Sequence, residues 1–495
     1  MPAGETPYDA VAYPSHAFPN THPDRMAAMA ILYGLAPTPV DRCRVLEIGC
    51  GDGANLVPMA YAIPGSEFVG FDLAHQPIER AQEWIRQLGL KNIRLFQLNL
   101  LDAGPELGTF DYIIVHGLYA WVPEPVRDRL LALCSQLLAP NGVAFVSYNA
   151  LPGGHIRIAM REMMLLSAEG IEDPEKRIAA SVAFLRSLIG ARPEGDAYRA
   201  LIEGQIKRLE ERAPRALYHD EFAEEYHPVR FIDFVQHAQE HGLQFLSDSE
   251  LPPPNDPCYQ TQIRTVLEKA APEDILKQEQ MLDFARMRLY RETLLCRANH
   301  SLRRDFPAEH FRKLLLASPA VSTRNEASGA ISFVLPGGIK METSHPGVNS
   351  LLMRLEAAWP HSLSFADIEP TLAGSGLALD TATTLLLMRL VVAKFVEIHS
   401  WNAPVSVAIP ERPRATLVAR QQARIQATAT TLLHLTIQLD DPIIRAFLPL
   451  LDGTRTRNEL LAALKTELPA IFPAEIENGM EPALQHFYRA GVLEA

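Results

Sequence analysis

Cysteine is scarce in this chain and does not occur in a pattern that binds metal or forms disulfides. Five cysteines are scattered over 495 residues, without a CxxC pair or a close Cys/His spacing. Zinc sites and disulfide frameworks need such spacings, because their ligands or partners must meet at short range. We therefore expect reduced thiols that pack in cores, and no metal site.

Two kinds of apolar segment are also missing. The N-terminal stretch MPAGETPYDAVAYPSHAFPN lacks the basic start and the apolar run of a signal peptide. No later window holds the uncharged apolar stretch of about 20 residues that would span a bilayer. We expect a cytoplasmic protein without membrane insertion.

Basic residues are outnumbered by acidic ones. The chain has 46 Lys and Arg against 59 Asp and Glu, which gives a formal net charge of −13. Nucleic-acid binding depends largely on clustered Lys and Arg, so we expect no nucleic-acid partner. An acidic chain is better suited to neutral or cationic partners.

Between residues 43 and 148, short apolar runs alternate with amphipathic stretches. This alternation is typical of βαβ units around a parallel sheet. The expected strands are CRVLEIG, SEFVGFD, NIRLFQL, DYIIVHG and GVAFVSYN. Five parallel strands in series predict an α/β fold with a doubly wound, Rossmann-like sheet, whose ligands bind at the carboxyl ends of the strands.

The pattern changes several times after residue 150. Helical periodicity replaces the strands, then a helix stopped by Gly242 and a short apolar run follow, and a long helical segment is expected over residues 275–299. The last third contains two similar units of helices and a short strand, which fit winged-helix-like α+β domains. We expect five segments: the core with an N-terminal segment (1–155), a helical insertion (156–217), a further domain (218–302), a middle winged-helix-like domain (303–410) and a C-terminal winged-helix-like domain (411–495).

The stretch VLEIGCGDGANL follows the first expected strand and can be interpreted in two ways. Its glycines suit either a dinucleotide loop or an S-adenosyl-L-methionine (SAM) loop, because both need a tight turn close to a ligand; they are Gly49, Gly51 and Gly53. The acids discriminate. Glu47 and Asp52 would crowd a pyrophosphate with like charge, whereas a sulfonium and an α-ammonium group would be attracted. The loop therefore favours SAM as the cofactor.

Polar residues also follow the second and third expected strands. Asp72 lies about twenty residues past the loop, where a carboxylate can accept hydrogen bonds from both ribose hydroxyls of either nucleotide. Asn99 ends the third strand, where its carbonyl can accept from an adenine amino group. The neighbouring Leu73 and Leu100 complete the expected cofactor site. The alternative is a plain strand-to-helix turn, with Asp72 as a cap of the next helix.

A known family shares these segments. VLEIGCGDGANL, FVGFDLA, LNLLD, DYIIVHGLYAWVP and LLAPNGVAFVSYNALPGG together resemble the bacterial, Rickettsia-type protein-lysine methyltransferases. HPVRFIDF, HGLQFLSDSE and EQMLDFARMRLYRETLLC resemble the methyltransferase regulatory domain of that family, which would occupy residues 218–302. The resemblance covers roughly residues 5–300. It implies a class I methyltransferase core, a dimerisation role for the helical insertion, a homodimer, and lysine side chains of a protein such as an outer membrane protein as substrate.

Candidate catalytic residues follow the fourth expected strand, which in this fold faces the reacting methyl group. Tyr119 and Trp121 could form an aromatic cage around a lysine stem, or they pack in the core of a loop. His116 could contact the cofactor or relay a proton, or it makes only a structural hydrogen bond. Tyr148 and Asn149, at the end of the fifth strand, are second candidates.

The N-terminal segment is a candidate lid. It is rich in Pro and His and carries Tyr8 and Tyr13. The sequence leaves open whether it folds over the cofactor or is an ordinary ordered tail.

Together these patterns predict a SAM-dependent N-methyltransferase that acts on lysine side chains of a protein. Some 340 residues beyond the core exceed what a metabolite pocket needs, and they suit a surface that positions a polypeptide. The alternatives are a small-molecule methyltransferase, a non-enzymatic SAM-binding regulatory protein, and a winged-helix regulator bound to DNA. The roughly balanced charge of the C-terminal units speaks against the last of these.

Overall fold

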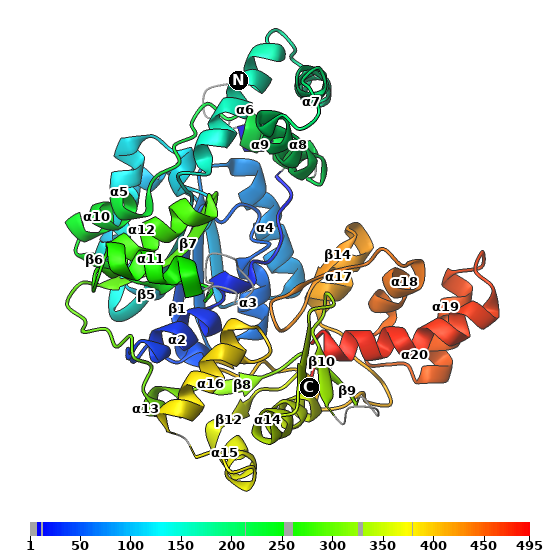
Figure 1. Ribbon diagram of the computed structural model, residues 1–495. Helices are drawn as coiled ribbons and strands as arrows, with labels where there is room; N and C mark the ends of the chain where they lie inside the picture. The colour runs from blue at the N-terminus through cyan, green and yellow to red at the C-terminus, as the bar shows by residue number, and fades with distance from the viewer. Residues whose placement is uncertain (1–6, 11–12, 213, 252–260, 325–329, 379) are drawn as a thin grey trace.

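One seven-stranded sheet organises the N-terminal part of the chain (Figure 1). The computed structural model describes residues 7–10, 13–212, 214–251, 261–324, 330–378 and 380–495. In spatial order the strands are β3 (Ile93–Gln97), β2 (Glu67–Asp72), β1 (Arg44–Ile48), β4 (Phe110–Val115), β5 (Leu138–Asn149), β7 (Tyr290–Arg297) and β6 (Leu243–Asp248). Strands β1 to β5 pair in parallel, and β7 runs antiparallel to both β5 and β6. The five predicted strands are confirmed, and two later strands extend the sheet.

The two faces of the sheet are covered by different helices, because side chains alternate along each strand. Val45 faces a core shared with α2 (Pro23–Leu32), α3 (Leu56–Ala62) and α4 (His75–Leu88). The next residue, Leu46, faces a second core shared with α5 (Glu124–Leu137) and α10 (Phe231–Glu240). Both faces are buried, which explains why the strands are nearly continuous apolar runs.

The prediction of one long helix over residues 275–299 is wrong in its second half. The segment contains α12 (Ile275–Arg286), preceded by α11 (Thr261–Ala270), and then turns into β7. Met287 adopts the left-handed conformation, with φ of 48°, and ends the helix. Within β7, the fully buried Arg291 bonds the carboxylate of Asp283. Pairing between two strands and a buried ion pair outweigh helix propensity, which is a weak prior.

Four helices follow β5 and project from the carboxyl end of the sheet (Figure 1). They are α6 (Gly154–Ser167), α7 (Pro174–Gly190), α8 (Ala197–Glu210) and α9 (Pro214–Glu221). Their own small core includes Met164, Leu185 and Ile206. On the outside, Phe184 and Leu188 stay exposed one helical turn apart on α7.

The middle part of the chain shares a core with α2 and α3, whereas the C-terminal part has a core of its own. The middle part contains α13 (Ala308–Phe311), β8 (Leu315–Ala317), β9 (Val321–Arg324), β10 (Ile331–Val334), β11 (Lys340–Thr343), α14 (Pro346–Ala358), β12 (Leu363–Ser364), α15 (Phe365–Gly374), α16 (Thr381–Val392) and β13 (Glu397–His399). Its core is continuous with that of α2 and α3. The C-terminal part has a separate core and contains α17 (Leu417–Ile425), β14 (Thr428–Thr430), β15 (Thr436–Gln438), α18 (Pro442–Leu450), α19 (Arg457–Glu467) and α20 (Pro473–Arg489).

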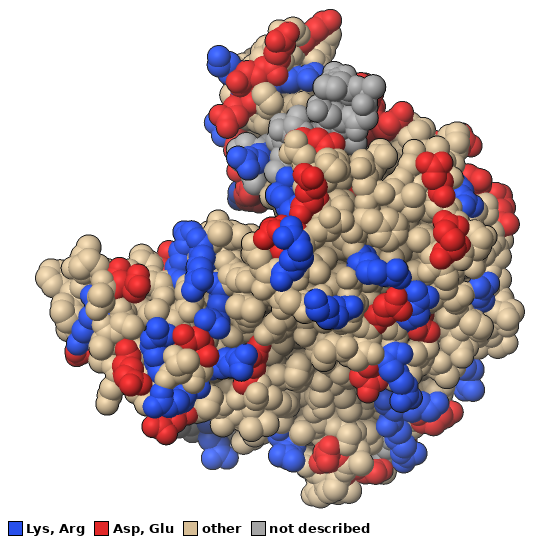
Figure 2. Space-filling view, turned by 180° about the vertical axis from the view of Figure 1, so that it is seen from behind, with Lys and Arg blue, Asp and Glu red and all other residues tan. Residues whose placement is uncertain are grey.

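The cysteines in the described part of the chain are unpaired, and the surface charge in Figure 2 is of both signs. Four cysteines are free and buried, Cys43, Cys50, Cys134 and Cys296, while Cys258 lies outside the described residues. No helix in the described part of the chain is long and apolar enough to cross a membrane. On the face drawn in Figure 2, basic and acidic side chains are interspersed over most of the surface.

Candidate functional site

The loop after β1 turns back sharply at the carboxyl end of the sheet. Gly51 sits at its tip with φ of +53°, and an added Cβ there would meet nothing within 4 Å. Glycine is therefore needed at position 51 for its left-handed backbone and not for lack of space, because the space beside it is open. Gly53 differs, because an added Cβ would lie 2.7 Å from Leu95 Cδ1. Gly49 also has a left-handed backbone, with φ of +77°, and an added Cβ there would make only an ordinary contact with Leu118 Cδ2 at 3.7 Å.

Glu47, the last acid before the loop, is buried with one oxygen unpaired. Its Oε1 accepts from Asn55 Nδ2 at 2.8 Å, and its Oε2 has no hydrogen-bond partner in the protein. Burial raises the pKa of Glu47 to about 8. A buried oxygen without a donor is costly, so it points to a ligand that brings a donor or a positive charge. The α-ammonium group of SAM fits that requirement.

Asp72 at the end of β2 is tied to the same loop. Its Oδ2 accepts from the backbone N–H of Gly51 at 2.9 Å, and its Oδ1 accepts from that of Ala74 at 2.9 Å. Burial raises the pKa of Asp72, although both backbone N–H groups oppose the rise. Leu73 beside it is half exposed. Asp72 thus fixes the loop and keeps lone pairs for ribose hydroxyls, since each carboxylate oxygen can accept more than one bond.

Asn99, which follows β3, caps the short helix that comes next. Its Oδ1 accepts from Leu101 N–H at 3.0 Å at the start of the short helix η3 (Leu100–Asp102), and Leu100 is buried. An amide carbonyl has two lone pairs, so the same oxygen can accept a second bond from an adenine amino group. The carboxyl ends of β1, β2 and β3 therefore bring together the residues predicted for the cofactor.

His116, after β4, is held between the N-terminal segment and the sheet. Phe18 stacks on its ring with centroids 3.7 Å apart, and the Tyr290 hydroxyl lies 3.3 Å from its Nε2. Burial lowers the pKa of His116 to about 4, so the imidazole is neutral at neutral pH. Tyr290 comes from β7 and was not among the sequence candidates, because the segment reads as helix.

The N-terminal segment crosses the open edge of this site. Tyr8 stacks on His219 of α9 with centroids 4.4 Å apart, and Asp9 Oδ1 accepts from the N–H of Gln76 at the start of α4 at 2.9 Å. Tyr13 is also close to His219, at 5.7 Å between ring centroids. The segment, with α1 (Pro7–Ala10), thus bridges the core and the helices that follow β5. This position is compatible with the predicted lid.

Tyr119 and Trp121 do not face one another as a single cage. They belong to a 3-10 turn, η5 (Tyr119–Trp121), which directs residues two apart to different sides. Tyr119 is buried against Phe234, and its hydroxyl bonds His237 Nδ1 at 2.8 Å. Trp121 lies 5.0 Å from Tyr226, between ring centroids, and two guanidinium groups, those of Arg157 and Arg161, cover its ring. Of the second candidates, Tyr148 is buried against Phe234, and Asn149 Oδ1 is buried without a partner.

A residue from the C-terminal part reaches the cofactor loop. His434, in the turn between β14 and β15, is buried and lies with Nε2 2.9 Å from Asn55 Oδ1. Its backbone adopts φ of +57°, a left-handed conformation that is unfavourable for a residue with a side chain. Since Asn55 also donates to Glu47, the chain of contacts runs from the C-terminal part to the loop. Sequence spacing could not reveal it, because 379 positions separate the two residues.

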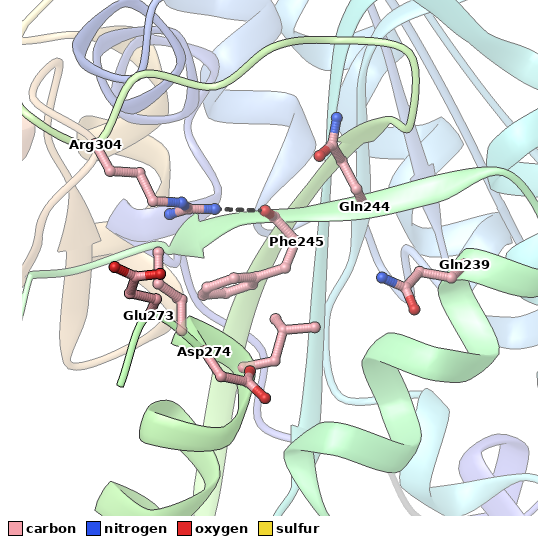
Figure 3. Close-up of a pocket in the computed structure, with 8 residues that line it drawn as sticks. Gln239, Gln244, Phe245, Glu273, Asp274 and Arg304 are labelled. Atoms are coloured by element: carbon pink, nitrogen blue, oxygen red, sulfur yellow. Dashed lines mark hydrogen bonds between the residues drawn. The ribbon is translucent and has the colours of Figure 1, made fainter. Parts of the chain in front are cut away.

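A separate pocket of about 370 Å³ opens beside β6 (Figure 3). Arg304 donates to the carbonyl oxygens of Phe245 and Leu246 at its wall. The full lining is Gln239, Gln244, Phe245, Glu273, Asp274, Ile275, Leu276 and Arg304. None of the residues predicted for cofactor or catalysis lines it, so it is distinct from the site at the strand ends.

Cofactor binding is expected to release a proton through Glu47. Near pH 6.5 the free protein holds Glu47 mostly protonated, because its pKa is about 8, whereas a bound α-ammonium group favours the carboxylate. We expect release of about one proton per SAM bound. Calorimetry in two buffers of different ionisation enthalpy measures it. Glu47→Gln should abolish the release, and equal proton release by the variant and the parent would contradict the assignment.

Known proteins match this chain along nearly its whole length. Three family models match this chain. The model described as "Methyltransferase domain" matches residues 46–144, and the model described as "Predicted methyltransferase regulatory domain" matches residues 213–297. The model described as "PKMT, C-terminal winged helix domain" matches residues 411–470. Uncharacterized protein RP028 of Rickettsia prowazekii is 33% identical over 240 residues, which are 48% of this chain and 96% of that protein. Uncharacterized protein RP789 of the same organism is 29% identical over 445 residues, 85% of this chain and 78% of that protein.

A solved structure has the same fold. PKMT2 from Rickettsia typhi in complex with AdoHcy superposes with a TM-score of 0.87 at 23% identity, and the match covers 97% of this chain and 99% of that one. These comparisons confirm the predicted fold class, a class I methyltransferase core with a C-terminal winged helix domain. They also confirm SAM as the cofactor.

Proposed function

Because the chain belongs to the bacterial, Rickettsia-type protein-lysine methyltransferase family, we propose that this SAM-dependent methyltransferase modifies lysine side chains of a protein substrate. The observation that carries the proposal is the succession of three matched domains, a methyltransferase domain, a regulatory domain and a PKMT winged helix domain. The match to a PKMT winged helix domain over residues 411–470 lies in the part that a metabolite enzyme would not need. Together with the contact between His434 and Asn55, it makes the C-terminal part an element of the catalytic unit.

Glu47, Asp72 and the glycine loop are assigned to hold SAM. Glu47 Oε2 would pair with the α-ammonium group and Asp72 with the ribose hydroxyls, while Asn99 and Leu100 would face the adenine. When bound, SAM supplies an electrophilic methyl group on a sulfonium. The protein must then align an amine behind that methyl group, since the reaction is an in-line displacement.

A lysine must lose a proton before it attacks, because its ammonium form has no lone pair. The lone pair of the neutral amine forms the new N–C bond as the C–S bond breaks, and AdoHcy leaves. His116 and Tyr290 are both uncharged at neutral pH, so they can accept and donate hydrogen bonds around the amine. Tyr290 is 37% exposed in the free protein, and a bound substrate would cover it and exclude water. Desolvation of this kind lowers the pKa of a lysine and favours its neutral form.

Trp121 remains the aromatic candidate for the lysine stem. Its ring pairs with that of Tyr226 and is covered by Arg157 and Arg161. The two guanidinium groups would repel a lysine ammonium, so this aromatic pair would suit the apolar stem and the neutral amine of a lysine. Tyr119 is assigned a different role, because it is buried and its hydroxyl is bonded to His237.

The homodimer implied by the resemblance belongs to this proposal. Phe184 and Leu188 of α7 leave an apolar stripe exposed on the helices that follow β5, and Leu201 of α8 is exposed as well. Exposed apolar side chains at neighbouring positions are typical of protein interfaces. Phe184→Glu with Leu188→Glu is expected to shift a dimer to a monomer in analytical ultracentrifugation. A single species of unchanged mass in parent and variant would contradict a dimer built on α7.

The substrate class is tested by transfer of label. The protein is incubated with methyl-labelled SAM and a bacterial lysate that includes outer membrane proteins, and label is followed into protein and small-molecule fractions. We expect label on lysine residues of one or few proteins, and none with Asp72→Ala. Label confined to small molecules would indicate a metabolite methyltransferase. SAM binding without any transfer would indicate a non-enzymatic, SAM-binding protein. Fractionation of the producing cells tests the cytoplasmic location that the proposal includes.

A further inference from the structure

Two histidines and an aspartate meet on the side of the sheet opposite to α3. His237 lies on α10, His241 is the residue directly after that helix, and Asp128 lies on the neighbouring α5 (Figure 1). Asp128 Oδ1 is 3.3 Å from His237 Nε2 and 2.7 Å from His241 Nε2. We propose that these three side chains bind one zinc ion. This proposal does not depend on which substrate the protein methylates.

The spacing of the ligand atoms suits a small ion. One oxygen and two nitrogens lie within 4.8 Å of one another. In a tetrahedral zinc site, bonds of about 2.0–2.1 Å place the ligand atoms a little over 3 Å apart. His237 lies in the last turn of α10 and His241 caps the helix four residues later, so both rings lie on the same side, with centroids 5.5 Å apart. The same i, i+4 arrangement supplies both histidine ligands in helical zinc motifs.

A buried hydroxyl orients the first histidine. Tyr119 OH lies 2.8 Å from His237 Nδ1. An Nδ1–H that donates to this hydroxyl leaves the Nε2 lone pair directed at Asp128 and free for a metal. Tyr119 itself is fixed by contact with Phe234 and Tyr148. Such outer contacts set the tautomer and the ring orientation of metal-binding histidines.

Exposure and charge favour an ion at this position. The side chain of Asp128 is 59% exposed and those of the histidines 21% and 19%, so an ion can enter and keep a water ligand. Asp233 on α10 is already paired with Arg230 at 2.6 Å, so the negative charge next to the two histidines is that of Asp128. This carboxylate favours a cation between the three side chains. Two imidazoles select zinc over magnesium and calcium, which prefer oxygen ligands.

The site would join α10 to α5, the helix that follows the β4 loop. Through Tyr119, an ion held by His237 would fix the turn that carries Trp121, three residues before α5 begins. The expectation of no metal site came from cysteine spacing, and this site uses no cysteine. The signal that could have revealed it is the H-x-x-x-H spacing within VQHAQEHG.

Calorimetry with zinc chloride tests the site. The full-length protein without a polyhistidine tag is first treated with a chelator. We expect one zinc ion per chain and a higher melting temperature with zinc, whereas magnesium and calcium chloride should give no binding. His241→Ala and Asp128→Ala should each weaken zinc binding at least about 100-fold, and Tyr119→Phe about 10-fold. His75→Ala, which removes an exposed histidine on α4, is the matched control and should bind zinc like the parent.

Two results would overturn the proposal. One is absence of zinc binding by the parent protein, which would leave only a network of hydrogen bonds between Asp128 and the two histidines. The other is equal zinc affinity in His241→Ala, Asp128→Ala and the parent, which would place any ion elsewhere. If either alanine variant fails to fold, His241→Gln replaces it, and X-ray absorption at the zinc edge must detect two imidazole ligands in the parent.

Discussion

Asp72→Ala is expected to weaken SAM binding at least about 100-fold and to abolish methyl transfer at ordinary cofactor concentrations. The carboxylate has two tasks in this site. It is assigned to the ribose hydroxyls, and it accepts from the N–H of Gly51, so it shapes the loop before the ligand arrives. A hydrogen bond to a charged group contributes about 1.5–3 kcal/mol. Loss of two such bonds therefore corresponds to at least two orders of magnitude in affinity.

Calorimetry with SAM and with AdoHcy measures this effect, and Glu83→Ala provides the control. Glu83 is an exposed carboxylate on α4, where it pairs with Arg86, so its removal changes the net charge equally without touching the loop. The control should bind both ligands like the parent protein. Near-parental affinity in Asp72→Ala would remove Asp72 from the cofactor site. A variant that has lost its secondary structure by circular dichroism is replaced by Asp72→Asn, which keeps the size of the side chain.

The parts of the molecule that sequence could predict are those in which neighbouring residues share one element. Strands β1 to β5 are apolar runs bounded by turns, and because they are parallel, their carboxyl ends lie at one edge of the sheet. Glu47 and Asp72 were therefore placed together without a structure. The identity of the cofactor followed from charge, because the acids in the loop repel a pyrophosphate.

Other features depend on contacts between distant segments. Residues 290–297 form a strand because β5 and β6 offer hydrogen-bond partners on both sides, which no local pattern shows. Tyr119 was expected at the substrate, yet His237, 118 positions away, engages its hydroxyl in the structure. The contact of His434 with Asn55 belongs to the same class, and it has the clearest functional consequence.

Asn55→Leu is expected to lower the free energy of unfolding by about 3 kcal/mol, since it leaves several buried groups without a partner at about 1 kcal/mol or more each. Asn55 accepts from the N–H of Phe18 at 3.0 Å, bonds His434, and donates to Glu47. Its loss would free Glu47 and detach the C-terminal part from the loop, so SAM affinity should also fall about 10-fold, the effect of about 1.4 kcal/mol.

His434→Ala separates the two effects, because it removes the ring that contacts Asn55 and His22 and keeps the bonds of Asn55 to Phe18 and Glu47. We expect a smaller loss of stability, about 1–2 kcal/mol, and a SAM affinity that falls in the same direction as in Asn55→Leu. His486→Ala, an exposed histidine on α20 of the same domain, should change neither quantity. Thermal denaturation and calorimetry measure both. Unchanged SAM affinity in His434→Ala would mean that the C-terminal part only packs against the core. A loss of SAM affinity in both His434→Ala and Asn55→Leu would show that the C-terminal part positions Glu47 through Asn55. The left-handed backbone of His434 would then have a functional reason, because it holds the imidazole against Asn55.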